Sequence, residues 1–314
     1  MATISDILNV VQCGLGNTLG TGTKGCEAFF KKTASLWITK RGFKYDSTRT
    51  LNNAYIEELK ASGDLIILKG VKTFEDNSSD DTIETLSDQT SSVASLGLYQ
   101  FTYGFTKGLG FLSALSSLRS FNSYDVAFVD VENNILSTSA SDGSMKGFST
   151  NMLNPSRLSF ATDSEGIQKQ YITLQLSERD ELDTDRRVFV DKGSLESGFY
   201  PKTIDGVNEV VLSFTAVPTD TDTSISVKAT LKQDGSAFTG ALYTDFLITK
   251  NGTTANPTAG NDNATAGTYV LTVAALSTND VLKISLYDNS NSRIGIVLDS
   301  EVFKSNTDSV VVVA

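Results

Sequence analysis

Residues 124–176 decide the fold, and they read YDVAFVDVENNILSTSASDGSMKGFSTNMLNPSRLSFATDSEGIQKQYITLQL. Apolar and polar residues alternate along this segment, and turn-forming residues interrupt the alternation at regular steps. Asparagine tolerates positive φ, so residues 132–134 (ENN) predict a turn between strands at 124–131 and 135–139. The pattern is typical of an antiparallel meander with one buried face.

Three further strands are predicted in the same segment. One covers 145–149, after a turn at Asp142-Gly143, and an antiparallel pair covers 157–161 and 167–176. No side chain in the segment has the pattern of a catalyst. The segment therefore indicates an architecture, and the role of a building block, more readily than a reaction.

Three helices are predicted upstream of the meander. Thr3 with Asp6 has the spacing of a capping box before a short apolar face. Residues 46–48 (DST) offer an N-cap for a second helix, and Gly63 is a natural C-cap for it. Strands are predicted at 35–39, with the single tryptophan, at 65–68 (LIIL) and at 98–105, with one aromatic face, followed by a helix at 109–118.

Residues 74–93 (FEDNSSDDTIETLSDQTSSV) differ in character, because they are rich in Asp, Glu, Ser and Thr. Runs of like charge are usually solvated, so the pattern favours an exposed acidic loop or hairpin edge. The alternative is a surface that faces a neighbouring copy of the chain.

Beyond residue 190 the composition changes twice. Residues 191–206 contain three Gly and one Pro, which is typical of a linker. From 207 to 314, about seven short β-rich runs alternate with turn residues, which predicts an immunoglobulin-like β-sandwich. We therefore predict an α+β, mostly β chain with four parts: a flexible N-terminal arm (1–45), an α+β assembly domain (46–190), the linker and the sandwich.

The composition excludes several classes of function. The chain has 314 residues, no histidine and a formal net charge of -11. Without histidine, Ser-His-Asp and Cys-His catalysis cannot occur within the chain. The negative charge disfavours nucleic-acid and anionic-membrane partners. Cys13 and Cys26 cannot form a four-ligand zinc site alone, although a single disulfide bridge between them stays open.

The first sixteen residues lack a basic secretory leader, and no apolar run is long enough for a membrane span. We therefore expect a soluble protein made in a cytoplasm.

Several local motifs have both a functional and a plain interpretation. Residues 20–25 match GxGxxG, but no βαβ pattern follows, so a flexible loop is favoured over a cofactor site. Residues 178–185 crowd five carboxylates among arginines, which favours a salt-bridged turn over a bound cation. Asp262 and its Asn neighbours favour a turn over a Ca²⁺ site, and Asn251-Gly252-Thr253 favours a hairpin turn over a glycosylation site. The aromatic residues at 99, 101, 103 and 105 favour a core over a stacking surface for sugars or bases. The sequence thus predicts no enzyme, and no catalytic, cofactor-binding or metal-binding residue.

Some stretches of the chain resemble virion proteins of tailed bacteriophages, and most closely those of phages infecting Bacteroidetes, including the crAss-like group. They are IEELKASGDLIILKG, GVKTFEDNSSDDTIETLSDQT, SFNSYDVAFVDVENNILSTSASDGSMKGFST and YITLQLSERDEL, and together they cover about 51–190. The resemblance implies a structural subunit of the particle that assembles in many copies as a capsid, neck or tail component.

We therefore expect a virion subunit that builds a neck or tail ring or tube with its α+β domain. Its partners would be copies of itself and portal, neck or tail subunits, and an acidic inner wall would let DNA slide through the lumen. Residues 14–25 and 74–93 are the expected contact faces. The alternatives are a capsid-associated or host-glycan-binding decoration protein that uses residues 207–314, and an enzyme that uses Asp183 and its neighbours with a metal.

Overall fold

The computed structural model describes residues 2–11, 29–85, 87–156, 168–183, 186–263, 266–290, 292–299 and 301–314. The chain divides into two compact units. Unit 1 comprises residues 1–56 and 64–205, and unit 2 comprises residues 57–63 and 206–314. Strands greatly outnumber helices in the described residues, and the strands form antiparallel sheets with one parallel pair, so the predicted α+β, mostly β class is confirmed.

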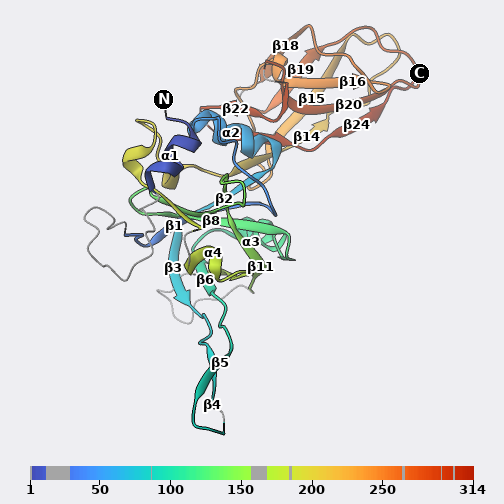
Figure 1. Ribbon diagram of the computed structural model, residues 1–314. Coiled ribbons are helices and arrows are strands. Elements are labelled where there is room, and N and C mark those ends of the chain that lie inside the picture. The colour runs from blue at the N-terminus through green and yellow to red at the C-terminus, as the bar shows by residue number, and fades with distance from the viewer. Residues whose placement is uncertain are drawn as a thin grey trace. The chain divides into compact units, whose positions relative to one another are not determined.

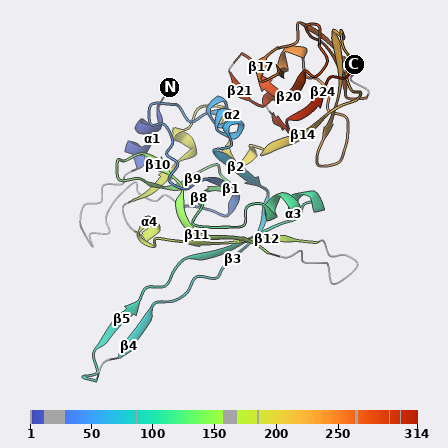
Figure 2. The ribbon, with the colours of Figure 1, turned by 90° about the vertical axis from the view of Figure 1, so that its right-hand side faces the viewer.

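Unit 1 is built on an antiparallel sheet that has eleven strands within the described residues. Its main path runs β10 (Met145–Lys146), β9 (Ile135–Ser139), β8 (Tyr124–Asp130), β11 (Phe148–Pro155), β12 (Gln170–Leu176), β6 (Gln100–Phe105) and β3 (Val71–Asp76), and its strands are labelled between Figure 1 and Figure 2. Four strands join its sides: β1 (Thr33–Lys40) lies between β8 and β2 (Leu65–Lys69), β7 (Ser120–Phe121) pairs with β11, and β13 (Arg187–Val190) pairs with β9.

Strand β11 belongs to both halves of this sheet. Phe148 and Ser149 pair with β8, whereas residues 150–155 pair with β12. The two halves face each other across one core, where the rings of Phe101 on β6 and Phe128 on β8 meet edge to face with centroids 6.1 Å apart. Such an arrangement buries apolar residues from both halves in one volume.

The helices of the described residues are α1 (Ile4–Val11), α2 (Asn53–Ser62), α3 (Leu109–Ser116) and α4 (Asp180–Asp183), with 3-10 turns at Lys192–Ser194, Pro201–Thr203 and Tyr243–Asp245. The capping box at the start of α1 is confirmed. The Thr3 N–H donates to Asp6 Oδ2 (2.8 Å), and the Asp6 N–H donates to Thr3 Oγ1 (3.3 Å).

The predicted N-cap of α2 at 46–48 is wrong. Asp46 Oδ1 instead accepts from the Thr48 N–H (2.9 Å) in a local turn, and Asn52 caps the helix by accepting from the Tyr55 N–H (3.0 Å). The predicted end of the helix is confirmed, because Gly63 follows α2 with φ +80°.

The central meander differs from the sequence prediction in two respects. The predicted third strand is divided into β10 and β11 at Gly147, where a Cβ would lie 2.8 Å from the Val126 backbone nitrogen. Strand β8 buries both faces rather than one, and β1 and β11 pair with its two edges. Val126 and Phe128 face the core, and Asp125 and Ala127 on the opposite face are equally inaccessible. The predicted strand at 157–161 lies outside the described residues.

Two predicted domain boundaries are also wrong. Residues 33–40 of the supposed N-terminal arm form β1, whose Trp37 pairs with Ala127 and is fully buried. Residues 191–205 are no linker, because they pack on unit 1 and bury Leu195 and Phe199. Glycine and proline in this segment serve short 3-10 turns and not a flexible tether.

Unit 2 is a two-sheet sandwich with the immunoglobulin strand order. One sheet runs β18 (Ala259–Asn263), β19 (Thr268–Thr272), β15 (Ser224–Leu231), β14 (Val207–Phe214), β23 (Glu301–Ser305) and β22 (Ile296–Leu298). The other holds β17 (Thr253–Thr254), β16 (Phe246–Lys250), β20 (Val281–Asp288), β21 (Arg293–Ile294) and β24 (Asp308–Val311). In the first sheet, β18, β19, β15 and β14 correspond to the immunoglobulin strands D, E, B and A. In the second sheet, β16, β20 and β24 correspond to strands C, F and G. The inserted β22–β23 hairpin pairs in parallel with β14.

Candidate functional site: a projecting acidic hairpin

The most distinctive feature of unit 1 is a β-hairpin that extends beyond the end of the β3–β6 ladder (Figure 2). The ladder continues through Asn77 N–H to Gln100 O (2.8 Å) and Ser79 N–H to Leu98 O (3.2 Å). It then forms β4 (Thr82–Thr85) and β5 (Ser91–Ser95), which pair only with each other in the described residues. We call residues 77–98 the hairpin arm.

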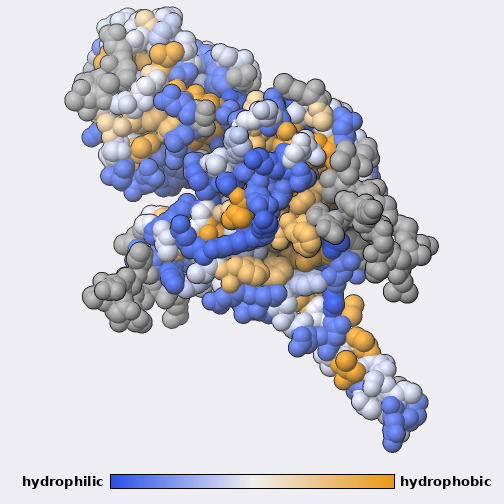
Figure 3. All heavy atoms as spheres, turned by 90° about the vertical axis from the view of Figure 1, so that its left-hand side faces the viewer, coloured by the Kyte–Doolittle hydropathy of each residue, from blue (hydrophilic) through white to orange (hydrophobic). Residues whose placement is uncertain are grey.

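Every described residue of β4 and β5 is exposed to solvent. Ile83 and Val93 lie directly opposite each other, with 65% and 55% of their surfaces exposed, and Leu96 is 58% exposed. Figure 3 shows orange, apolar patches on the narrow projection that the hairpin arm forms. A two-stranded hairpin that buries no face is marginally stable alone in water. The hairpin arm therefore gains stability from any surface that covers its apolar pair.

The turn at the tip of the hairpin arm is stabilised by local hydrogen bonds. Asp88 Oδ1 accepts from the Thr90 N–H (3.0 Å) and from the Thr90 hydroxyl (2.5 Å), and Gln89 has φ +66°. Hydrogen bonds to Thr90 lower the pKa of Asp88, so its carboxylate is charged at neutral pH. Leu86 lies outside the described residues.

The base of the hairpin arm is held by a polar cluster. The Gly97 N–H donates to Asp81 Oδ1 (2.9 Å), and the Arg179 guanidinium bonds the same carboxylate. Arg179 also donates through Nε to Asp183 Oδ2 (2.5 Å), and the Tyr99 hydroxyl bonds Asp183. The Gly97 bond, and then Arg179, lower the pKa of Asp81. Burial raises the pKa of Asp183, but Tyr99 and Arg179 outweigh it and lower that pKa overall.

This cluster decides the interpretation of the acidic segment 178–185. Asp183 pairs with Arg179, Glu178 pairs with Arg186 (3.2 Å), and the buried Glu181 pairs with Lys146 (2.6 Å). A salt-bridged turn is therefore confirmed within the described residues. In the described part of the chain, no three acidic, His or Cys side chains gather as metal ligands would.

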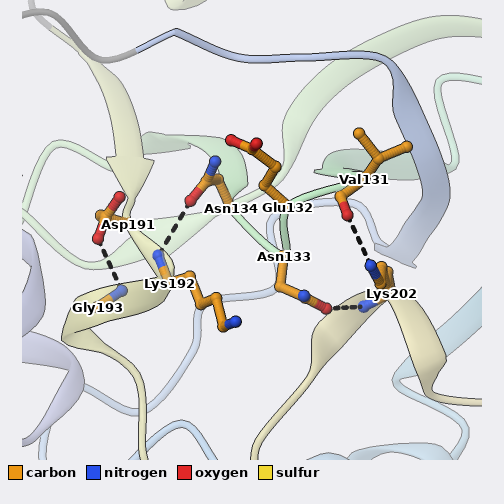
Figure 4. A pocket seen from close by; sticks show the side chains of 8 residues that line it. All are labelled: Val131, Glu132, Asn133, Asn134, Asp191, Lys192, Gly193 and Lys202. Carbon is orange, nitrogen blue, oxygen red and sulfur yellow. Dashed lines mark hydrogen bonds between the residues drawn. The ribbon is translucent and has the colours of Figure 1, made fainter.

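A second polar feature is a surface depression of about 500 Å³ beside the β8–β9 turn (Figure 4). The Lys202 N–H donates to Asn133 Oδ1 (3.2 Å), and the Lys192 N–H donates to Asn134 Oδ1 (3.0 Å). Lys202 Nζ donates to Val131 O (2.7 Å). These hydrogen bonds hold residues 191–203 against the turn, so the residues that line the depression have a structural role.

A third feature is the buried carboxylate of Glu181. Its oxygens accept from Lys146 Nζ (2.6 Å), the Ser149 N–H (2.6 Å) and the Ser149 hydroxyl (3.1 Å). The carboxylate is fully satisfied and fully enclosed, so it fixes α4 on β11.

Most of the other sequence candidates have structural roles. Tyr103 and Phe105 are buried in the core, which confirms the packing interpretation of the aromatic strand. Asn251 (φ +52°) and Gly252 (φ +81°) form the hairpin turn between β16 and β17, as predicted. Asp262 lies on β18, and its side chain is not described. Cys13, Cys26 and residues 20–25 lie outside the described residues.

No helix in the described ranges is long and apolar enough to cross a membrane. No protein-family model matches the chain, and no curated protein matches it. One solved structure that aligns with it is SGBP-B of the Bacteroides ovatus mixed-linkage glucan utilization locus, in complex with a mixed-linkage heptasaccharide. The two are 11% identical with a TM-score of 0.20, and the alignment covers 79% of this chain and 62% of that one. The chain thus spans less than two thirds of that protein, and a similarity of this size carries no weight for fold or function.

Proposed function

We propose that the protein is a structural subunit of a tailed bacteriophage virion that assembles with copies of itself into a neck or tail ring or tube. Unit 1 makes the contacts and the immunoglobulin-like unit 2 faces outward. The resemblance of residues 51–190 to virion proteins supports the proposal that the chain is part of a virus particle. The observation that carries the assembly role is the hairpin arm, which exposes an apolar pair and two strand edges.

The exposed strand edges explain why a partner is needed. An unpaired edge presents backbone N–H and C=O groups that another chain can bond, and natural monomers usually protect such edges. Here β4 and β5 are covered by no other described element. Six carboxylates keep the hairpin arm and its approach soluble before assembly: Glu75, Asp76, Asp80, Asp81, Glu84 and Asp88. A net charge of -11 is also compatible with a lumen that repels DNA and lets it pass.

Removal of the hairpin tip tests the proposal. Residues 82–95 are replaced by Asn-Gly, which closes the ladder between Asp81 and Leu96 with a two-residue turn. The full-length wild type should form rings or tubes in electron micrographs and oligomers by mass photometry. The variant should remain monomeric with an unchanged thermal midpoint, because the removed strands are exposed.

Two substitutions provide a milder version of the same test. Ile83→Ser together with Val93→Ser keeps the backbone of the hairpin arm and removes its apolar pair. Assembly should weaken while the monomer melts as before. A wild type that stays monomeric at every concentration contradicts the proposal. If that monomer is retained on a glycan array, the glycan-binding alternative is supported instead.

A further inference from the structure

The charges of unit 1 are separated along the β3–β6 ladder. Between Lys72 and Lys107 the chain has six carboxylates and no Lys or Arg, and all six lie from Glu75 onward, toward the hairpin arm. Among the described residues, neither Asp80 nor Glu84 has an ion-pair partner. The acidic side chains thus gather at the end of the ladder that leads to the tip.

The opposite end of the same ladder carries lysines. Lys32 Nζ donates to Lys72 O (2.9 Å), and a Cβ on Gly70 would lie 3.8 Å from the Lys107 side chain. Lys69 lies next to Gly70 and pairs with Asp205 (2.9 Å). We call Lys32, Lys69, Lys72 and Lys107 the lysine end. The Lys72 ammonium forms no ion pair within the described residues, and Lys32 and Lys72 are both exposed.

A surface that is acidic at one end and basic at the other suits head-to-tail association. Such a heterologous contact joins two different patches, and it builds rings or filaments from identical copies. Charge complementarity also sets the orientation of the two copies when they meet. An exposed Phe29, 70% accessible, lies three residues before Lys32 and offers an apolar contact for the Ile83–Val93 pair.

We propose that the hairpin arm of one copy docks on the lysine end of the next copy. This inference rests on the proposed function and names the surface through which the copies associate. Asp80 and Glu84 pair with Lys72 and Lys32 across the contact. The partner is a second copy of this chain, because the complementary charges lie at opposite ends of one ladder.

Cross-linking of the wild type tests the contact directly. Lys72 and Glu84 are twelve residues apart along extended chain, about 40 Å at ~3.3 Å per residue, so a zero-length link cannot form within one copy. An equal mixture of ordinary and ¹⁵N-labelled protein is treated with a carbodiimide. Links that join Asp80 or Glu84 to Lys72 or Lys32 in mixed-isotope peptides are expected. Assemblies in which the hairpin arm links only to other lysines would overturn the proposal.

Charge reversal gives an independent test. The K32E/K72E and D80K/E84K variants should each weaken self-association roughly tenfold or more. An equal mixture of the two variants should assemble, because each contact again joins opposite charges, and the chain with all four changes should assemble alone. K228E/K283E, which reverses two exposed lysines of unit 2, should assemble like the wild type.

The outcomes separate the two proposals. If K32E/K72E and D80K/E84K assemble like the wild type, or if the mixture stays dissociated, the lysine end is not the docking surface, although the proposed function can stand. If the wild type does not assemble, the proposed function itself fails. Thermal unfolding of each variant confirms that a lost assembly reflects the contact and not the fold.

Discussion

Arg179 and Asp81, 98 residues apart in the sequence, meet at the base of the hairpin arm. The same Asp81 oxygen accepts the Gly97 N–H at 2.9 Å, and the same guanidinium donates to Asp183 at 2.5 Å. One arginine therefore joins the first strand of the hairpin arm to α4. This contact fastens the base of the hairpin arm to the segment that carries α4.

Arg179→Gln should loosen the hairpin arm without unfolding unit 1. The substitution removes the charge that Asp81 and Asp183 share, and the hydrogen bonds of the base weaken. Amide hydrogen exchange at Ser79 and Gly97 should accelerate. Arg187→Gln is the control, because Arg187 donates to Leu182 O and does not touch the hairpin arm. Equal rates of amide exchange at Ser79 and Gly97 in both variants would show that Arg179 does not stabilise the base of the hairpin arm.

Gly97→Ala should disrupt the base of the hairpin arm more severely. A Cβ at this position would lie 1.8 Å from Ser79 O, so the two strands must separate. We expect a loss of about 2 kcal/mol in the free energy of unfolding, measured by urea denaturation. Gly108→Ala is the matched control, because a Cβ there has no neighbour within 4 Å. Similar stability of the two variants would contradict the close approach.

Lys146→Met should be one of the most destabilising single changes in unit 1. It leaves the fully buried Glu181 carboxylate with only the Arg186 guanidinium, 3.6 Å away, as a cationic partner, so the free energy of unfolding should fall by about 3 kcal/mol. The double variant Lys146→Met/Glu181→Leu should recover part of this loss, because no buried charge remains. Lys31→Met removes an exposed pair with Glu132 and should change the stability little. A Lys146 variant as stable as the Lys31 variant would refute the prediction.

Asp125 should make the stability of unit 1 depend on pH. Burial raises the pKa of this carboxyl, and Glu181 acts in the same direction, whereas the Gly42 N–H, Lys146 and Arg41 oppose them. A raised pKa in the folded state stabilises the fold below the unfolded pKa of about 3.9, and this contribution is lost as the pH rises through the folded pKa. Asp125→Asn stays neutral, so it should become more stable relative to the wild type as the pH rises above about 4.

Asp142→Asn supplies a control of opposite sign. Lys44 and the Ser144 backbone lower the pKa of Asp142, so its contribution is present at neutral pH and lost on acidification. The variant should lose stability relative to the wild type as the pH rises from about 2 to about 5. Urea denaturation across the pH range measures both variants. If the stability of the Asp125 and Asp142 variants changed with pH in the same direction, burial would not control the pKa of Asp125.

Local patterns in the sequence predicted individual elements well. The strand at Ile135–Ser139 has the predicted bounds, and Asn133 at φ +75° makes the predicted turn. These features depend on neighbouring residues, which a sequence displays directly. The order of strands in the sheet could not be predicted. Alternation alone reveals neither that β1 lies beside β8 nor that both faces of β8 are covered in the folded chain.

The candidate site was predicted in part. The acidic composition of 74–93 indicated an exposed hairpin edge or a partner surface, and the structure confirms the exposure. The cluster at its base could not be predicted, because Arg179 reaches Asp81 only through the tertiary fold. The gathering of Lys32, Lys72 and Lys107 at one end of the ladder has no sequence signal either, since the three lie on separate strands and loops.

The absence of lysine and arginine between residues 72 and 107 has a practical consequence for anyone handling the protein. Trypsin cleaves after basic side chains and so has no target along the exposed hairpin, whereas a glutamate-specific protease has one at Glu84. Unassembled subunits should thus survive the first enzyme at this position and be nicked by the second. If copies associate through the hairpin as proposed, resistance to that cleavage on a gel measures the fraction of chains that have assembled.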